Sequence, residues 1–142
     1  MHISSTATAT IKRPLAEAWA VLADHEGMSA WGPGIKVTLS TEGSPDRNGV
    51  GAVRRISTPG PTPTIVEEIT AFEPTRYLAY RALSGVPLRD YRGEVELTDQ
   101  DGQTFVQYTV HADSRLPLVE KAMVKGIAKG LLSSFVKAAE KA

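Results

Sequence analysis

Apolar and polar residues alternate with a period of two along most of this chain, and that pattern predicts a protein built mainly from β-strands. The alternation occupies residues 2–11, pauses, and resumes from residue 35. Stretches rich in Gly, Pro, Asn and Asp separate one strand from the next. One face of the strands is apolar and the other polar, which is typical of an antiparallel sheet covered on one side. We expect strands over residues 2–11, 35–42, 50–58, 64–72, 76–84, 91–99 and 103–112.

Between the first two predicted strands, the apolar residues recur at helical intervals. Pro14 suits the first turn of a helix, where its missing N–H would have no partner, and apolar residues follow at helical intervals. We therefore expect an amphipathic helix over residues 14–24 and a short second helix over residues 28–31. Trp19 and Trp31 are expected to anchor these two helices to the end of the sheet.

A long helix is predicted from about Leu118 to Ala139, after the last strand. Its apolar stripe consists of Met123, Ile127 and Leu131, which repeat every four residues. No other element is long enough to cover the sheet. The expected fold class is α+β: a seven-stranded antiparallel sheet wrapped around a long C-terminal helix, with two short helices between the first two strands.

Two opposite charges fall on the apolar face of the hairpin that turns at the proline-rich stretch 58–63. If the turn centres between Gly60 and Pro61, paired residues have numbers that sum to 121, and Arg54 lies opposite Glu67. The same register pairs the apolar residues Ile56 with Ile65 and Ala52 with Ile69. Because burying ions costs several kcal/mol each even when they pair, this face suits a partly wet pocket better than a dry core. The alternative is an ion pair that only fixes the register of the hairpin.

Three tyrosines, Tyr80, Tyr91 and Tyr108, are predicted on the same inner face. Each combines an apolar ring with a hydroxyl that needs a partner when buried, which suits an amphipathic ligand. Ordinary core packing is the alternative for each of them. Tyr108 belongs to the last hairpin, where residues whose numbers sum to 201 are expected to pair, so that Tyr108 faces Gly93.

Composition excludes several classes of function. A chain of 142 residues is long enough for one domain, residues 1–142, with a core of its own. Lys plus Arg and Asp plus Glu both number 16, so the basic surplus of a nucleic-acid-binding protein is missing. No apolar run reaches the length of a membrane span, and the first residues do not read as a signal peptide. With no cysteines for a thiol nucleophile or a disulfide, we expect a cytoplasmic protein without an integral membrane segment.

No cofactor and no metal site are expected. His2, His25 and His111 lie far apart in the sequence, and no group of residues has the spacing of metal ligands. No Ser-His-acid arrangement or glycine-rich phosphate loop is present. Glu67 and Glu68 are adjacent on a strand and face opposite sides, so they do not form a pair of catalytic carboxylates.

The order of elements resembles the START-like superfamily, also called SRPBCC. This is the helix-grip fold of birch-pollen-type allergens, polyketide cyclases and abscisic-acid receptors. Trp19 in the first helix, residues 49–54 at the start of a strand and residues 66–69 on the next strand carry the resemblance. Residues 57–61 resemble the gate loop of the hormone receptors, and residues 84–91 resemble their latch loop.

The resemblance implies that Glu67 and Tyr91 line a pocket and that Arg54 and Ile56 lie on the strand before the gate. The hormone receptors bind a carboxylate through a lysine on the second strand. Lys36 occupies that strand here but alternates to the outer face, so the receptors' lysine has no inward counterpart.

We expect a binding protein that holds a small hydrophobic or amphipathic ligand (lipid-, polyketide- or isoprenoid-like) in a cavity between the sheet and the C-terminal helix. The expected contacts are Arg54, Ile56, Ile65, Glu67, Ile69, Tyr80, Tyr91, Tyr108, Met123, Ile127 and Leu131. One alternative is an enzyme of the polyketide cyclase or dehydratase type, in which Arg54 stabilises an enolate oxygen and Glu67 or a tyrosine moves protons. Another is a protein-interaction module that uses the proline-rich loop 58–63. Both a monomer and a homodimer are compatible with the sequence.

Overall fold

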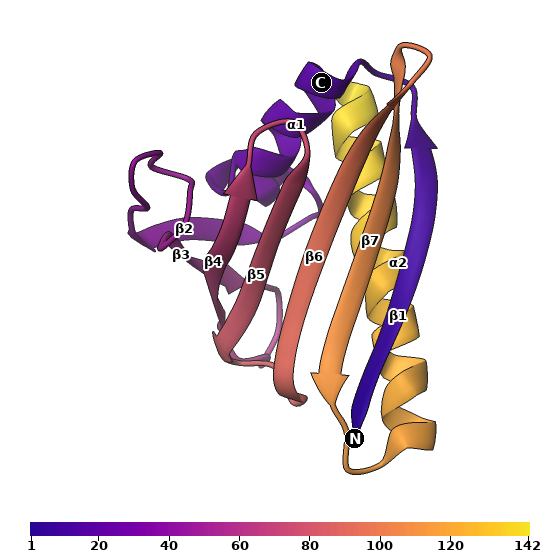
Figure 1. The fold of residues 1–142 in the computed structure, drawn as a ribbon. Helices are drawn as coiled ribbons and strands as arrows, with labels where there is room; N and C mark the ends of the chain where they lie inside the picture. Colours follow the sequence, from indigo (N-terminus) through magenta and orange to yellow (C-terminus); the bar gives the residue numbers. More distant parts are fainter.

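Seven strands form one antiparallel sheet in the computed structural model of this protein, which describes residues 1–142 (Figure 1). Their order is β1-β7-β6-β5-β4-β3-β2, so the first and last strands of the chain are neighbours at one edge. The predicted seven-stranded α+β architecture is confirmed. The strands are β1 (His2–Ile11), β2 (Lys36–Thr41), β3 (Val53–Ser57), β4 (Ile65–Glu73), β5 (Tyr77–Ser84), β6 (Arg89–Gln100) and β7 (Gln103–Asp113).

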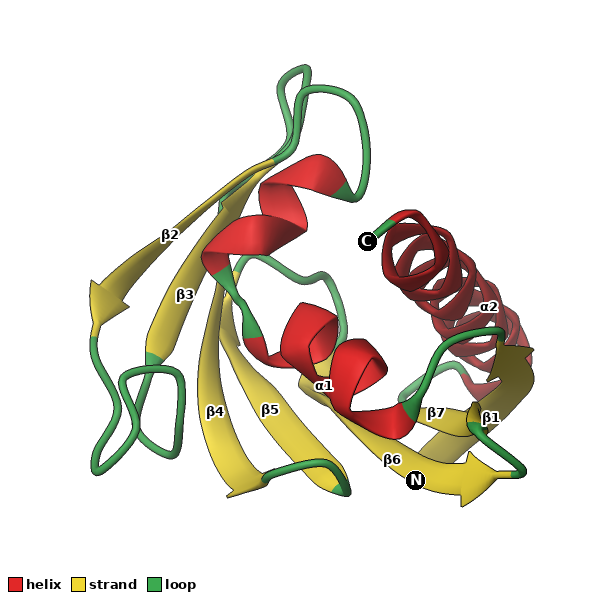
Figure 2. Ribbon diagram, turned by 90° about the horizontal axis from the view of Figure 1, so that it is seen from above, coloured by secondary structure: helices red, strands yellow, loops and turns green.

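Helices lie on the concave side of the curved sheet (Figure 2). They are α1 (Leu15–Ala23), the short 3₁₀ helix η1 (Glu26–Ala30) and the long α2 (Pro117–Lys141). The main contacts of α2 are with β1 and β7, while η1 packs on β2, and α1 contacts α2, β6 and β7. No helix has the combination of length and apolar character that would let it cross a membrane. The packing of α2 is thus concentrated at one edge of the sheet rather than over its middle strands.

The predicted inner face of the strands is the buried one. On β7, every second residue from Thr104 to Ala112 is buried. The buried stripe of α2, however, is one position away from the predicted stripe, and Met123 is 38% exposed. Two residues of the buried stripe are alanines, whose small side chains let the helix approach β1 and β7 closely. Hydrophobicity alone does not reveal a stripe that contains alanines. Its buried residues are Val124, Ala128, Leu132, Phe135 and Ala139.

The hairpin of β3 and β4 has the predicted register. Arg54 faces Glu67, and Ile56 faces Ile65. Just before β3, the carbonyl of Ala52 accepts a hydrogen bond of 2.8 Å from the N–H of Ile69, which extends the same pairing. The residues of every pair in this hairpin therefore have numbers that sum to 121, as predicted.

The hairpin of β6 and β7 differs from its predicted register by two residues. Tyr108 faces Val95 and not Gly93, so paired numbers sum to 203. Asp101 and Gly102 alone form the turn, with φ angles of 53° and 85°. Two consecutive residues with positive φ make the tight turn that matches the twist of a hairpin, whereas the sequence predicts a four-residue break. A shift of two leaves every side chain on its predicted face.

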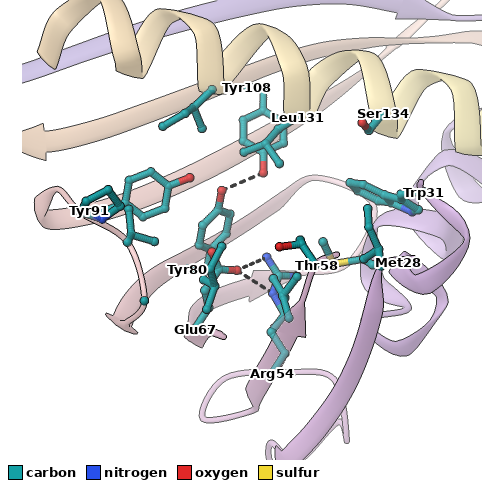
Figure 3. Close-up of a pocket in the computed structure, with 17 residues that line it drawn as sticks. Met28, Trp31, Arg54, Thr58, Glu67, Tyr80, Tyr91, Tyr108, Leu131 and Ser134 are labelled. Atoms are coloured by element: carbon teal, nitrogen blue, oxygen red, sulfur yellow. Dashed lines mark hydrogen bonds and ion pairs between the residues drawn. The ribbon is translucent and has the colours of Figure 1, made fainter. Parts of the chain in front are cut away.

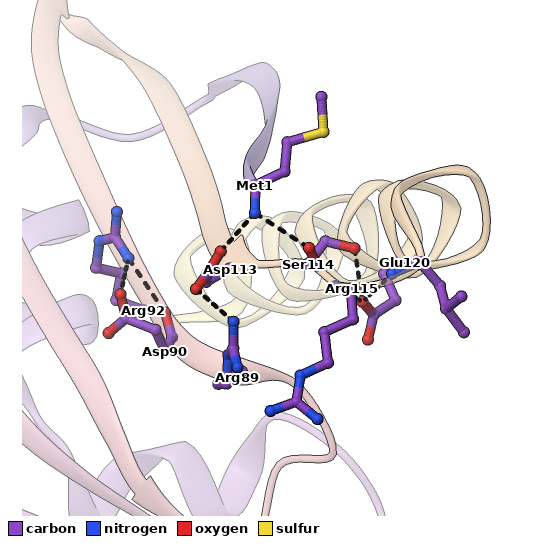
Figure 4. A network of polar contacts seen from close by, with 9 residues as sticks. Met1, Arg89, Asp90, Arg92, Asp113, Ser114, Arg115 and Glu120 are labelled. Atoms are coloured by element: carbon purple, nitrogen blue, oxygen red, sulfur yellow. Dashed lines mark hydrogen bonds and ion pairs between the residues drawn. The ribbon is translucent and has the colours of Figure 1, made fainter.

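Polar contacts hold the start of α2 against the end of the sheet (Figure 4). Oε1 of Glu120 accepts hydrogen bonds from the Ser114 hydroxyl at 2.6 Å and from the backbone N–H groups of Arg115 and Leu116. The bond from Ser114 is the main reason that the pKa of Glu120 is lowered. Beside it, Arg89 of β6 pairs with Asp113 of β7 at 2.9 Å. These contacts fix the turn that leads from the sheet into the helix.

Candidate ligand-binding site

A cavity of about 320 Å³ lies between the inner face of the sheet and α2 (Figure 3). It is lined by 17 residues, of which 11 are hydrophobic. Strands β3 to β7 form one wall, α2 forms another, and loop residues such as Thr58 and Pro87 complete it. Nine of the eleven predicted contacts line this cavity: Arg54, Ile56, Ile65, Glu67, Tyr80, Tyr91, Tyr108, Ile127 and Leu131.

Two predicted contacts do not line the cavity. Ile69 lies two residues beyond Glu67 on β4, where it is 1% exposed and belongs to the solid core. Met123 lies on the exposed side of α2, because the helix turns its alanine-containing stripe to the sheet. The predicted polar and aromatic residues therefore lie in the cavity wall, and of the predicted helical residues only Ile127 and Leu131 do.

Arg54 and Glu67 form a buried ion pair in the cavity wall. Arg54 is 3% exposed and Glu67 is 5% exposed. Nε of Arg54 donates a hydrogen bond of 2.9 Å to Oε1 of Glu67, and Nη2 lies 2.7 Å from the same oxygen. Burial acts against the charge of Arg54, but Glu67 and the nearby tyrosines outweigh it and raise the pKa of the guanidinium. The cavity thus carries a fixed positive charge beside a fixed carboxylate.

The three predicted tyrosines meet around this pair. The ring of Tyr80 lies 4.8 Å from the Arg54 guanidinium carbon, in a cation–π arrangement. The hydroxyls of Tyr80 and Tyr108 share a hydrogen bond of 2.8 Å. Tyr91 points its hydroxyl towards the same space (Figure 3). Burial raises the pKa of all three, to about 12 for Tyr91, so each is a neutral phenol at pH 7.

Gly93 makes room for the ring of Tyr80. The two residues are paired across β5 and β6, and a Cβ at Gly93 would lie 2.4 Å from the hydroxyl end of the Tyr80 ring. A larger residue at this position would displace the ring from Arg54. The glycine therefore shapes the polar end of the cavity without contacting it.

His25, which follows α1, was not predicted to take part in the site. It is completely buried, and its Nδ1 lies 3.1 Å from Nη1 of Arg54, while its Nε2 lies 2.7 Å from the carbonyl oxygen of Asn48. A carbonyl only accepts and a guanidinium only donates, so Nε2 carries the proton and Nδ1 accepts. Burial, followed by the charge of Arg54, lowers the pKa of His25 to about 4. A neutral histidine thus supports Arg54 from behind, and nothing in its spacing marks it in the sequence.

Residues from loops and short helical segments complete the cavity. Trp31, predicted only as an anchor, lines the cavity and stacks on Phe135 of α2, with ring centroids 5.6 Å apart. Gly85, in the segment that resembles a latch loop, has a φ of 92°, and a Cβ there would lie 2.2 Å from the carbonyl oxygen of Thr64. This loop is therefore seated directly on the start of β4. Only a glycine fits that contact.

The other two histidines lie away from the cavity. His2 and His111 stack on the outer face of the sheet, with 2.9 Å between ring nitrogens, and His111 lies 3.0 Å from Oε2 of Glu94. The protein has no group of three or more His, Cys, Asp or Glu side chains arranged to hold a metal ion. Lys36 is exposed, as the alternation of inward and outward residues on its strand predicts.

A curved antiparallel sheet that holds a long C-terminal helix, with a mainly apolar cavity between the two, defines a helix-grip protein. The chain belongs to the polyketide cyclase / dehydrase and lipid transport family, whose family model matches residues 2–140. The resemblance to the START-like superfamily is thereby confirmed.

Two crystal structures illustrate the shared fold. That of Ara h 8.0201 has a TM-score of 0.76 and 18% sequence identity, over 99% of this chain and 97% of that one. That of the ZhuI aromatase/cyclase from Streptomyces sp. R1128 has a TM-score of 0.78 and 22% identity, over 99% of this chain and 95% of that one. No curated protein sequence matches the chain.

Proposed function

We propose that this protein binds a small, mostly apolar ligand with a polar end, of lipid-, polyketide- or isoprenoid-like character, in the cavity beneath α2. The observation that carries the proposal is a buried ion pair facing a cavity of about 320 Å³ whose lining is otherwise mainly apolar. Binding cavities of proteins commonly combine such an apolar lining with a few convergent polar groups. A volume near the lower end of their usual range favours a compact ligand.

In this proposal the cavity holds the two ends of the ligand differently. The apolar body lies against Ile56 and Ile65 of the sheet and against Ile127 and Leu131 of α2. Such contacts hold a ligand through burial of apolar surface, without fixed orientation. Arg54 and its polar neighbours orient the other end through hydrogen bonds.

A cavity-blocking variant with a matched control tests the proposal. Ile127→Trp places a large ring in the cavity, whereas Met123→Trp places the same ring on the exposed side of the same helix. We expect the wild type and Met123→Trp to enhance the fluorescence of the neutral apolar dye Nile red, and Ile127→Trp to lose that enhancement. Native mass spectrometry of protein purified from its own host should show a co-purifying small molecule that Ile127→Trp lacks. Equal dye binding by both variants would place the binding site elsewhere and refute the proposal.

A second candidate is an enzyme of the polyketide cyclase or dehydratase type. The family description and the similarity to an aromatase/cyclase structure support it, together with a buried guanidinium beside three neutral phenols. Arg54 would stabilise a developing enolate oxygen, and Glu67 or Tyr91 would transfer protons. In an enzyme, Arg54→Lys and Glu67→Gln should lower turnover of a poly-β-keto substrate by orders of magnitude while binding survives. In a carrier, both variants should change affinity only modestly, and no turnover should be measurable.

A further inference from the structure

We infer that the ligand of this cavity is electrically neutral and that its buried end is a hydroxyl or an amide-like group rather than a carboxylate or a phosphate. The inference rests on the proposed binding function and specifies the chemical class of the ligand. It follows from the charge balance of the lining and from the hydrogen-bonding groups that the lining leaves free.

The lining has no net charge. Arg54 and Glu67 are the only charged side chains among its 17 residues, and their closest atoms are 2.7 Å apart. The three tyrosines are neutral phenols at pH 7, because burial raises their pKa. His25 behind Arg54 is also neutral, and Lys36 points away to solvent. A ligand anion would therefore find no unpaired positive charge inside the cavity.

The pair still has hydrogen-bonding capacity to spare. A guanidinium has five N–H groups. In Arg54, Nε and Nη2 are directed to Oε1 of Glu67, and Nη1 donates to His25. One N–H on each terminal nitrogen remains without a protein partner. Oε2 of Glu67 makes no hydrogen bond within the protein either, although the residue lines the cavity.

Free donors and a free acceptor thus lie side by side at one end of an apolar cavity. A group that both donates and accepts, such as a hydroxyl or a primary amide, can satisfy them together. A carboxylate only accepts, so it would compete with Glu67 for Arg54 and place two carboxylates against one guanidinium away from water. Like charges that share a buried site disfavour each other strongly. A neutral ligand avoids this repulsion.

Two probes of nearly the same shape isolate the effect of charge. 2-Naphthamide and 2-naphthoate differ in whether the substituent is a neutral amide or an anionic carboxylate. By isothermal titration calorimetry at pH 7, we expect the wild type to bind 2-naphthamide at least about tenfold more tightly than 2-naphthoate. Equal or tighter binding of 2-naphthoate would overturn the inference.

The variant Glu67→Gln should reverse the preference for the neutral probe. It keeps the shape of the side chain but leaves the charge of Arg54 uncompensated. We expect 2-naphthoate to bind this variant at least about tenfold more tightly than it binds the wild type, so that the preference for 2-naphthamide is reversed. Arg54→Lys keeps the charge balance and should retain the wild-type preference. If Glu67→Gln does not fold, the comparison of the two probes on the wild type still decides the question.

The outcomes separate this inference from the proposed function. If Nile red binds the wild type and is lost in Ile127→Trp, but 2-naphthoate binds as well as 2-naphthamide, the binding function stands and ligand neutrality is refuted. If neither probe nor Nile red binds the wild type, the proposed function is refuted and the inference falls with it. Preference for 2-naphthamide in the wild type, with its reversal in Glu67→Gln, supports both.

Discussion

The interior of this protein has two parts that share one sheet face and differ in how they are filled. Between α2 and the strands β1 and β7, the side chains of Ile11, Val106, Val110 and Phe135 are completely buried. Around β3, β4 and β5, the same inner face carries charged and phenolic side chains and borders a cavity. Both parts follow the same period-two alternation. Periodicity therefore determines which side chains point inward, and side-chain chemistry determines whether the interior closes.

Polar groups keep the second part open. Aliphatic side chains gain by filling any space between them, because each additional contact is favourable. Arg54, Glu67 and the tyrosines must keep their hydrogen bonds, since a buried polar group without a partner is costly. Because α2 packs mainly on β1 and β7, Ile127 and Leu131 do not close the gap from the other side.

The largest effect should come from removing one charge of the buried pair. Arg54→Met leaves Glu67 buried without its partner and should lower the free energy of unfolding by about 3–5 kcal/mol. Arg54→Met combined with Glu67→Leu removes both charges, so it should recover most of the loss and make the open part resemble the packed part. Urea denaturation followed by circular dichroism measures both. A single variant as stable as the wild type would show that water reaches Glu67 freely.

Two adjacent leucines of α2 give the most direct comparison. Leu132 belongs to the packed core and Leu131 lines the cavity. Leu132→Ala should cost roughly 2–5 kcal/mol of stability because it leaves an unfilled space in a close-packed region. Leu131→Ala should cost only about 1 kcal/mol, since it loses fewer contacts, but it should weaken Nile red binding. Equal losses in urea denaturation would contradict the distinction between the two parts.

His25 should make the stability of the open part dependent on pH. Its pKa is about 4 in the folded protein, against about 6.5 in the unfolded chain. As the pH is lowered, the unfolded chain therefore binds the proton first. The contribution of His25 to the free energy of unfolding is fully present above pH 6.5 and is lost as the pH falls towards 4. The loss attributable to His25 should be about 3 kcal/mol at most.

His25→Gln is the control for this pH dependence. It retains a donor and an acceptor but cannot titrate. Its urea midpoint should change less than that of the wild type between pH 7 and pH 4.5, although the carboxylates of the protein titrate in both. Identical pH profiles would show that His25 protonates without cost in the folded state.

The smallest effect should come from filling the cavity. Ser134 projects from α2 into it (Figure 3), and Ser134→Leu would occupy part of the space. We expect an increase in stability of about 1 kcal/mol, as for other cavity-filling substitutions, together with loss of Nile red binding. Thermal denaturation and dye fluorescence measure the two effects. A destabilised variant would indicate that the cavity cannot accept a larger aliphatic group at this position.

Local patterns were sufficient to predict most of the sheet and its pocket. The alternation around the proline-rich turn placed Arg54 opposite Glu67 and all three tyrosines inward, since period two and a correct turn centre determine both. The β6–β7 register was wrong because Asp101 and Gly102 form a two-residue turn within a stretch of four turn-forming residues. The residues alone do not show which of these four belong to the strands.

The parts of the site that were missed come from outside the periodic elements. His25 and Trp31 lie in or beside short helical segments, where a single residue carries no repeating signal. Their roles depend on how α1 and η1 dock against Arg54 and Phe135, which is a long-range feature of the fold. The stripe of α2 was misplaced for a related reason, since Met123 is the more hydrophobic residue but Ala128 allows the closer approach.

The position of Trp31 gives this protein an optical reporter of its own. Its indole lies against the packed core on one side and borders the cavity on the other. The chain has only one other tryptophan, Trp19, which packs on Phe72 and does not border the cavity. In a Trp19→Phe background, the emission of the remaining indole would shift when a molecule fills or leaves the adjacent space. Occupancy could then be followed without any added dye, in real time and at low protein concentration.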